Sequence, residues 1–157
     1  MLDKCKLALI CIMLVGCSVS EETETNSVRD FTMVKSDFDS TVTWMQGTQF
    51  MNAKNTSNDE KINRQYWITV WENNCNIPKT NISITGTDCG SGTVGGHVVL
   101  GNKQTAVQNV QPGDSMFIAP ICRSQNASPS LEMKVGSPSY SKAGGVCVVK
   151  IKNFNPK

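Results

Sequence analysis

The chain has 157 residues, of which 15 are Lys or Arg and 13 are Asp or Glu, and its formal net charge is +2. This length allows one domain with a modest core and excludes two domains of comfortable size. Residues 18–60 carry eight acidic and three basic residues, whereas residues 61–157 carry four acidic and ten basic ones. The basic residues form no dense run, so nucleic acid is not an expected partner. Either these residues form an ordinary solvated surface, or they bind a polyanionic partner.

The amino-terminal segment has the plan of an export signal. Lys4 and Lys6 precede an uncharged apolar run, LALICIMLV, at residues 7–15. A run of nine residues is too short to span a bilayer as a helix, because about 20 residues are needed. We therefore expect residues 1–16 to be a cleaved signal peptide and not a permanent membrane span.

The apolar run ends in four residues, Leu14, Val15, Gly16 and Cys17. They resemble the lipobox of bacterial lipoproteins. The resemblance implies that Cys17 carries palmitate or similar acyl chains, becomes the first residue after cleavage and holds the protein at a membrane. Ser18 follows in place of an aspartate, which in that family implies the outer membrane, with the domain facing the periplasm. The alternative is an ordinary secretory signal with a chance cysteine near its end.

The segment after Cys17 has little to bury. Residues 18–26 read SVSEETETN, which is acidic and rich in hydroxyl groups. We expect residues 17–30 to be a lipidated, flexible tether, and residues 31–157 to be a single globular domain.

The first part of the predicted domain contains weak strand signals. Between Phe31 and Met51, short apolar pairs alternate with polar residues, including Val42 with Trp44. This alternation indicates one or two strands, interrupted at Gly47.

The next segment supports two different predictions. Ser57 and Glu60 have the spacing of a capping box, which favours a helix over residues 58–72. The sequence YWITVW at residues 66–71 instead favours a strand, because aromatic and β-branched residues prefer sheets. Both predictions stand at this point.

The rest of the chain has a clear strand pattern. Short apolar runs are separated by Gly and Pro turns, such as CGSGTVGG at residues 89–96 and the turn at residues 112–114. The predicted strands are residues 81–86, 96–101, 105–110, 115–122, 131–135 and 145–152. The expected fold class is therefore α+β and β-rich: a small single domain with mostly antiparallel strands and room for one helix.

Four cysteines remain in the predicted domain: Cys75, Cys89, Cys122 and Cys147. In an oxidising envelope compartment they predict two disulfide bonds, with three possible pairings. We expect Cys75 with Cys89 and Cys122 with Cys147, because these pairs close the shorter loops. The alternative is a zinc site, with Cys75, Cys89, Cys122 and His97 as its S₃N ligands.

His97 is the only histidine in the chain. Any mechanism that needs a proton carrier near neutral pH must use it, and a metal site with two histidines is excluded. It follows a glycine loop and opens an apolar strand, where a histidine is more often structural or exposed. The acidic residues Glu72, Asp88, Asp114 and Glu132 are dispersed, so their spacing predicts no two-carboxylate glycosidase site.

Within residues 71–126, Cys75 and Cys89 precede a glycine pair and His97, and Pro120, Cys122 and Asn126 follow. This order resembles that of the treble-clef HNH endonucleases. The resemblance implies His97 as the general base that activates water, Asn126 as a group that orients the base or substrate, and a divalent ion such as magnesium at the phosphate. The chain departs from the family at Gly96, where the family has a metal-binding acid or histidine. The residues that carry the resemblance are Cys75, Cys89, Gly95, Gly96, His97, Cys122 and Asn126.

The aromatic cluster Tyr66, Trp67 and Trp71 could stack on sugars or bases, but core packing is the preferred interpretation. No cofactor is expected apart from the zinc or magnesium of the alternatives above. The sequence therefore favours a non-enzymatic envelope lipoprotein that binds another envelope protein or a polyanion and reaches the membrane through Cys17. The alternatives are an HNH-like metal-dependent nuclease or hydrolase that uses His97, and an envelope inhibitor or immunity-type lipoprotein.

Overall fold

The computed structural model describes residues 37–56, 59, 61–111, 113–142 and 145–152. The predicted signal peptide, Cys17 and the predicted tether lie outside these residues, and so do Ser57 and Glu60 of the predicted capping box. Within the described ranges, no helix combines the length and the apolar character that a membrane crossing requires.

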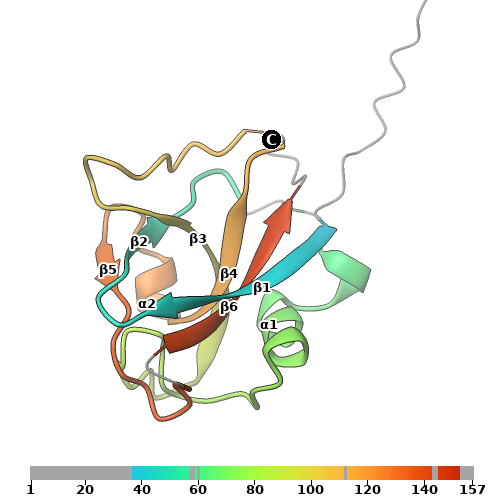
Figure 1. Cartoon of the computed structure of the whole chain (residues 1–157), viewed down its shortest axis with the longest axis vertical. Coiled ribbons are helices and arrows are strands. Elements are labelled where there is room, and N and C mark those ends of the chain that lie inside the picture. Colours follow the sequence, from blue (N-terminus) through green and yellow to red (C-terminus); the bar gives the residue numbers. More distant parts are fainter. Residues whose placement is uncertain (1–36, 57–58, 60, 112, 143–144, 153–157) are drawn as a thin grey trace, which may run out of the picture. The chain divides into compact units, whose positions relative to one another are not determined.

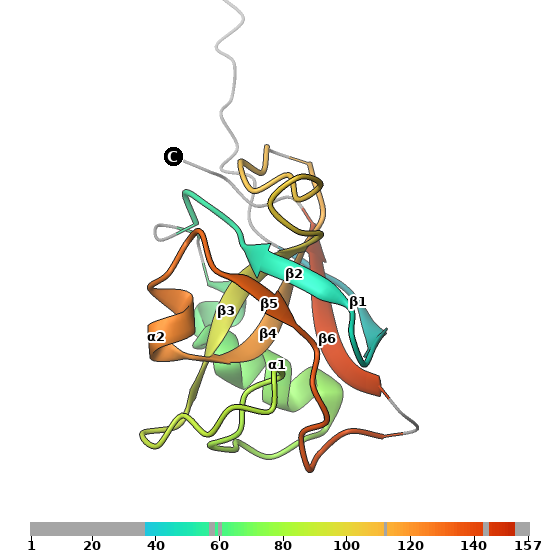
Figure 2. The same ribbon diagram turned by 90° about the vertical axis from the view of Figure 1, so that its left-hand side faces the viewer.

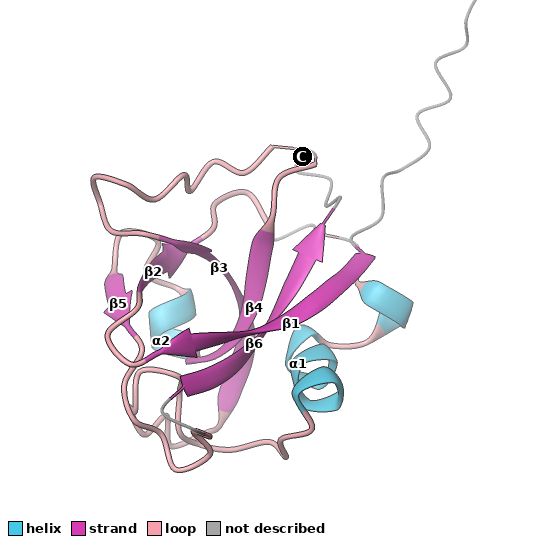
Figure 3. Cartoon of the chain, viewed as in Figure 1, coloured by secondary structure: helices cyan, strands magenta, loops and turns pink. Residues whose placement is uncertain are grey.

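The described residues form a β-rich α+β domain, which confirms the predicted fold class (Figures 1 and 3). Six strands pair into one antiparallel sheet, and α1 packs against β3, β4 and β6. A short 3-10 turn, η1, and a one-turn helix, α2, complete the described elements. Their bounds are β1 Asp37–Met45, β2 Gln49–Asn52, η1 Ile62–Arg64, α1 Trp67–Cys75, β3 Thr93–Leu100, β4 Met116–Cys122, α2 Arg123–Asn126, β5 Glu132–Lys134 and β6 Gly145–Lys152.

The sheet joins segments that are far apart in the chain. Its strand order is β1-β6-β4-β3-β2-β5, with each neighbouring pair antiparallel. The last strand of the chain, β6, thus lies between β1 and β4, and its register places Val146 opposite Trp44. The weak strands expected before residue 51 are β1 and β2, and the turn between them contains Gly47 with a φ of 85°.

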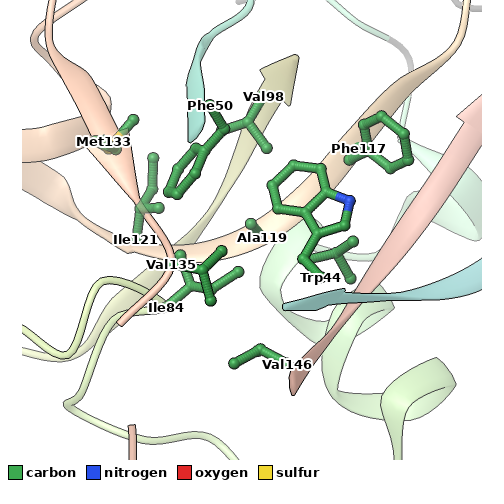
Figure 4. Packing of buried hydrophobic residues seen from close by; sticks show 11 residues of the cluster. Trp44, Phe50, Ile84, Val98, Phe117, Ala119, Ile121, Met133, Val135 and Val146 are labelled. Carbon is green, nitrogen blue, oxygen red and sulfur yellow. The ribbon is translucent and has the colours of Figure 1, made fainter. Parts of the chain in front are cut away.

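The sheet curls, so that its two ends meet around an inner core (Figure 2). The Trp44 ring from β1 lies 5.5 Å from the Phe50 ring of β2 and 5.0 Å from the Phe117 ring of β4. The Gly47 N–H donates to the Val135 carbonyl at 2.8 Å, which links the β1–β2 turn to the chain after β5. Figure 4 displays this apolar packing; the cluster consists of Trp44, Phe50, Ile84, Val98, Phe117, Ala119, Ile121, Met133, Val135, Val146 and Val148.

A second core fills the space between the sheet and α1. Trp71 of α1 is fully buried, and its indole N–H donates to the Cys147 carbonyl of β6 at 2.8 Å. Val70 lies beside it and is 1% exposed. These contacts hold α1 against the outer face of the sheet; the buried members of this cluster are Ala53, Val70, Trp71, Ile77, Val99, Val110, Met116, Ile118, Val149 and Ile151.

The helix prediction is confirmed for residues 67–72, and α1 continues to Cys75; the strand alternative for residues 66–71 is wrong. The β-favouring side chains of this segment are accommodated because Val70 and Trp71 can bury against the sheet from a helix, and tertiary packing outweighs propensity. The helix begins at Trp67 instead of residue 58. The backbone before it is irregular, since Asn63 and Arg64 have positive φ angles of 49° and 60°.

Four of the six predicted later strands are confirmed as β3, β4, β5 and β6, and β3 begins at Thr93, before the predicted start at Gly96. The predicted strand at residues 81–86 is wrong, since only an isolated bridge joins Ile82 to Asp88 there. Hydroxyl groups bond locally and turn the chain instead. The Ser83 hydroxyl lies 2.7 Å from that of Thr85, and the Ser83 N–H donates to the Thr87 carbonyl at 2.9 Å.

The predicted strand at residues 105–110 is also wrong, and this segment is a loop. The Asn102 side-chain oxygen accepts hydrogen bonds from the backbone N–H groups of Gln104 and Thr105, at 3.0 and 3.2 Å. This turn directs the chain away from the sheet. Further on, the Gln108 side-chain amide donates to the Asn52 carbonyl at 2.8 Å. A side chain thus satisfies a carbonyl of β2 that a neighbouring strand would otherwise have paired.

Both disulfides form, but the expected pairing is wrong. Cys75 is joined to Cys147, and Cys89 to Cys122. Cys75 ends α1, which lies over β6 and therefore over Cys147. Cys89 precedes β3, whose first residue, Thr93, lies opposite Cys122 at the end of β4. Packing of the helix and strand pairing thus decide the partners, and loop length does not.

Candidate functional site

Two glycines of β3 bring other elements close to the middle of the sheet. A Cβ atom at Gly95 would collide with the backbone of Trp67 and Ile68 in the first turn of α1. A Cβ atom at Gly96 would collide with Ile121 on the opposite face. The glycines lie inside the strand and not in a flexible loop before it, and they let α1 sit directly on β3.

His97 follows this glycine pair and is held from two sides. Its side chain is 7% exposed, and its Nε2 atom lies 3.3 Å from Oδ2 of Asp59, whose side chain is 1% exposed. The Trp67 ring packs edge-on against the imidazole, with ring centroids 4.6 Å apart and an interplanar angle of 75°. The Nε2 atom is buried and forms no hydrogen bond with a described residue.

A pocket of about 450 Å³ opens beside His97. Asn52 of β2 reaches it because Asn52 pairs with Val98, the neighbour of His97 in β3. The Asn52 amide nitrogen donates to the carbonyls of Gln125 and Ser128, at 2.7 and 3.1 Å. We call this the His97 pocket; it is lined by Asn52, Ala53, Lys54, Asn55, Thr56, His97, Asn126 and Pro129.

The structure brings together His97 and Asn126, the two residues that the HNH resemblance singled out. Both line the His97 pocket, because α2 follows β4 directly and β4 pairs with β3. Neither residue is in a metal cluster: the part of the chain that the structure describes contains no group of three or more His, Cys, Asp or Glu side chains placed to hold an ion.

The alternative zinc set does not assemble. Its cysteines, Cys75, Cys89 and Cys122, are all engaged in disulfide bonds. Zinc binds thiolates, and a disulfide offers none. His97, the fourth member of that set, faces Asp59 instead.

A second hollow, of about 400 Å³, runs beside the first turn of α1. Three cations reach it from separate segments: Lys61 before the helix, Lys79 after it and Arg123 at the start of α2. The exposed Tyr66 ring lies beneath Lys61, with the ammonium 4.3 Å from the ring centroid. We call this the basic groove; it is lined by Lys61, Tyr66, Trp67, Ile68, Thr69, Glu72, Lys79, Thr93, Val94, Gly95 and Arg123.

The three cations of the basic groove are available to a ligand. Lys61, Lys79 and Arg123 are exposed, and none of them forms an ion pair with another described residue. Glu72 is the one acidic residue in the lining. The groove therefore combines an excess of positive charge with two aromatic side chains.

The predicted aromatic cluster divides between core and surface. Trp71 is fully buried, which confirms core packing for that residue. Tyr66 is 72% exposed, so core packing is wrong for it, and Trp67 is half-buried between His97 and the basic groove.

The dispersed acidic residues mostly fix turns. Asp88 accepts from the Gly90 N–H at 2.9 Å, and Asp114 from the Gln111 N–H at 2.9 Å. Glu132 likewise accepts from a backbone N–H. These three carboxylates therefore bond to three separate segments of the described chain.

No sequence pattern identifies Asn52, Lys54 or Asp59 as residues in or around the His97 pocket. Asp59 lies between Ser57 and Glu60, whose spacing indicates a helix start and not a partner for His97. Comparison of the chain with protein-family models, with curated proteins and with solved structures gave no significant match.

Proposed function

We propose that this chain is a non-enzymatic binding domain of the bacterial cell envelope, held at a membrane by lipid on Cys17, and that its basic groove binds a polyanion. The ligand class is a polymer that carries repeated sulfate, phosphate or carboxylate groups. Two disulfide bonds in so small a domain are typical of an oxidising compartment, which supports export.

One observation carries the binding proposal: Lys61, Lys79 and Arg123 converge on one groove without ion-pair partners among the described residues. Surface cations that serve only for solubility have no reason to meet around a hollow. The adjoining rings of Tyr66 and Trp67 add flat apolar surface against which a sugar ring can stack. This combination suits an anionic polysaccharide.

Immobilised heparin, a sulfated polysaccharide, tests the proposal. We expect the domain to bind at 0.15 M salt and to elute as salt rises, since exposed charges are screened. The triple variant Lys61→Gln, Lys79→Gln, Arg123→Gln should bind at least about tenfold more weakly, because each exposed contact contributes about 0.5–1 kcal/mol.

The matched control removes three exposed lysines elsewhere: Lys103→Gln, Lys134→Gln, Lys142→Gln. Both triple variants change the net charge equally. If the control loses as much affinity as the groove variant, binding reflects general charge, and the proposed groove is wrong.

The anchor is tested separately, in the full precursor. Cys17→Ser removes the thiol that the lipobox resemblance identifies as the acylation site. We expect the wild-type chain to remain with membranes after a carbonate wash and the variant to be released. A variant that stays in the membrane fraction would refute the anchor.

A second candidate, a hydrolase, is favoured by the placement of His97 against buried Asp59 in a pocket that also holds Asn126. A histidine oriented by a carboxylate can take a proton from water. Incubation of the purified domain with DNA, with and without magnesium or manganese, beside His97→Ala, tests it. Histidine-dependent cleavage would replace the binding proposal.

A further inference from the structure

We propose that Glu72 makes the basic groove selective for acidic polysaccharides whose sugar rings keep free hydroxyl groups. The cations of the groove bind the acidic groups of such a polymer, and the Glu72 carboxylate accepts a hydrogen bond from a hydroxyl of the same sugar. Densely sulfated or phosphorylated polymers still meet the cations but offer few such donors. This selectivity presupposes that the groove binds a polyanion, as proposed above.

The Glu72 carboxylate has an acceptor that is open to a ligand. The side chain lies half-buried on α1 and lines the basic groove. Neither of its oxygens forms an ion pair or a hydrogen bond with a described residue, and only Oε1 is buried. The Oε2 atom is therefore the oxygen that a ligand in the groove can reach.

Lys79 lies near Glu72 but does not neutralise it. Both residues line the basic groove and also a smaller hollow of about 340 Å³ at the end of α1. The Lys79 side chain extends toward the glycine loop, where a Cβ atom at Gly92 would lie 3.4 Å from the Lys79 Cε atom. The two opposite charges thus lie near one another without pairing, and each is available to a different group of one ligand.

The chemistry of a carboxylate determines which ligand satisfies it. A carboxylate accepts hydrogen bonds and donates none, so it requires a donor from the ligand. A hydroxyl that donates to a carboxylate forms a charge-assisted bond, which is roughly twice as strong as a neutral one. A fully ionised sulfate or phosphate group has no hydrogen to donate and is repelled. The groove therefore favours a sugar whose acidic group contacts a cation while its hydroxyls remain free to donate.

The aromatic side chains of the groove agree with this choice. Tyr66 is 72% exposed, and Trp67 is half-buried at the start of α1. A sugar ring that stacks on an aromatic face directs its hydroxyls outward from the ring edge. Ile68 follows Trp67, and Glu72 lies one helical turn beyond Ile68 on the same face of α1. The carboxylate therefore lies farther along the groove than the aromatic surface, where it can meet such a hydroxyl.

The experiment compares two ligands that differ only in their donors. Oligogalacturonate has a carboxylate and free hydroxyls on each sugar, and its O-acetylated form keeps the carboxylates but loses the hydroxyl donors. Titration calorimetry of the disulfide-bonded protein should show that the wild type prefers the free form. In Glu72→Ala this preference should fall at least about threefold, because the acceptor is absent. Any steric effect of the acetyl groups cancels, since both proteins meet the same two ligands.

The control variant, Glu132→Ala, removes the same charge from an exposed site outside the groove and should keep the full preference. If the wild type shows no preference, or if Glu72→Ala keeps it, Glu72 acts only as a negative charge and the inference is wrong. Heparin reports separately on the groove. If the triple variant of Lys61, Lys79 and Arg123 loses heparin affinity, only the selectivity fails; if it does not, polyanion binding in the groove fails as well.

Discussion

Trp67 and His97 are packed edge to face, with their ring centroids 4.6 Å apart. Trp67 lines the basic groove, and His97 lines the neighbouring pocket, so this one contact separates the two sites. Gly95 makes the contact possible, because it lets the first turn of α1 rest on β3. The geometry of both sites therefore depends on how α1 is seated.

The seating of α1 predicts the effect of Gly95→Ala. The added methyl group would collide with the backbone of Trp67 and Ile68, so we expect the free energy of unfolding to fall by about 3 kcal/mol. Gly90→Ala is the control, since its Cβ meets nothing within 4 Å and its φ of 61° costs about 1 kcal/mol. Urea unfolding measures both. Equal losses of unfolding free energy in the two variants would contradict the close approach of α1 to Gly95.

The Cys75–Cys147 disulfide ties α1 to β6 across 72 residues. Replacing both cysteines by serine should lower the free energy of unfolding by about 4 kcal/mol, because the unfolded chain regains the entropy of a long loop. Replacing Cys89 and Cys122, which are 33 residues apart, should lower the free energy of unfolding nearly as much. Non-reducing peptide mapping checks the pairing directly, and a peptide that joins Cys75 to Cys89 would contradict the structure.

Tyr140 packs edge-on against Trp71, and its buried hydroxyl has no hydrogen-bond partner among the described residues. Burial raises the pKa of Tyr140 above its ordinary value of 10.0. The wild-type protein should therefore lose stability as the pH rises above about 10, where the unfolded chain ionises.

The variant Tyr140→Phe should be at least as stable as the wild type at pH 7, because it removes an unsatisfied group without changing the ring. Its unfolding free energy should also fall less at alkaline pH, because the variant has no hydroxyl at position 140 to ionise. Unfolding curves at pH 7 and pH 11 test this. A variant destabilised by more than about 1 kcal/mol at pH 7 would indicate a hydrogen bond that the structure does not contain.

Asp39 links the edge strand β1 to β6 through Lys152 and Lys150, at 2.9 and 3.3 Å. The hydrogen bond from Lys152, with a further one from Lys150, holds the Asp39 pKa below its ordinary value of 3.8. The stabilisation by these ion pairs is therefore present above pH 3.8, and it is lost as the pH falls through the lower pKa that Asp39 has in the folded state.

Asp39→Asn removes this dependence on pH. The difference in unfolding free energy between the wild type and the variant should be small at pH 6 and should narrow further below pH 3.8. Acid titrations of both proteins measure it. A difference that widens on acidification would contradict the ion pairs.

Strands β3, β4 and β6 were predictable because they are short apolar runs bounded by turn residues. The two wrong strands, at residues 81–86 and 105–110, contain β-branched residues, but their hydroxyl groups bond to the nearby backbone. Ser83 accepts from the Thr87 N–H, and Thr105 accepts from the Asn102 N–H. Propensity does not register that competition. The helix that begins at Trp67 was uncertain because of tertiary packing. Its apolar side chains are buried against a sheet that is built mostly from later residues.

The candidate sites were harder to predict. The residues around the His97 pocket come from three separate parts of the sequence, and no local spacing links these parts: Asn52 with Asp59, His97, and Asn126. They meet because β2 and β4 flank β3 and because α2 follows β4. The predicted disulfide partners were wrong for the same reason. Strand pairing brings distant segments together, so the length of the loop between two cysteines is a poor guide to which cysteines pair.

Tryptophan resonances can show whether a polyanion binds in the basic groove. The three tryptophans differ in exposure: Trp67 lines the groove, whereas Trp44 and Trp71 are 5% and 0% exposed. In a titration of the ¹⁵N-labelled domain with a heparin octasaccharide, the indole N–H of Trp67 should shift saturably while those of Trp44 and Trp71 stay in place. A heparin complex in which the Trp67 resonance does not move would mean that the polyanion binds outside the basic groove.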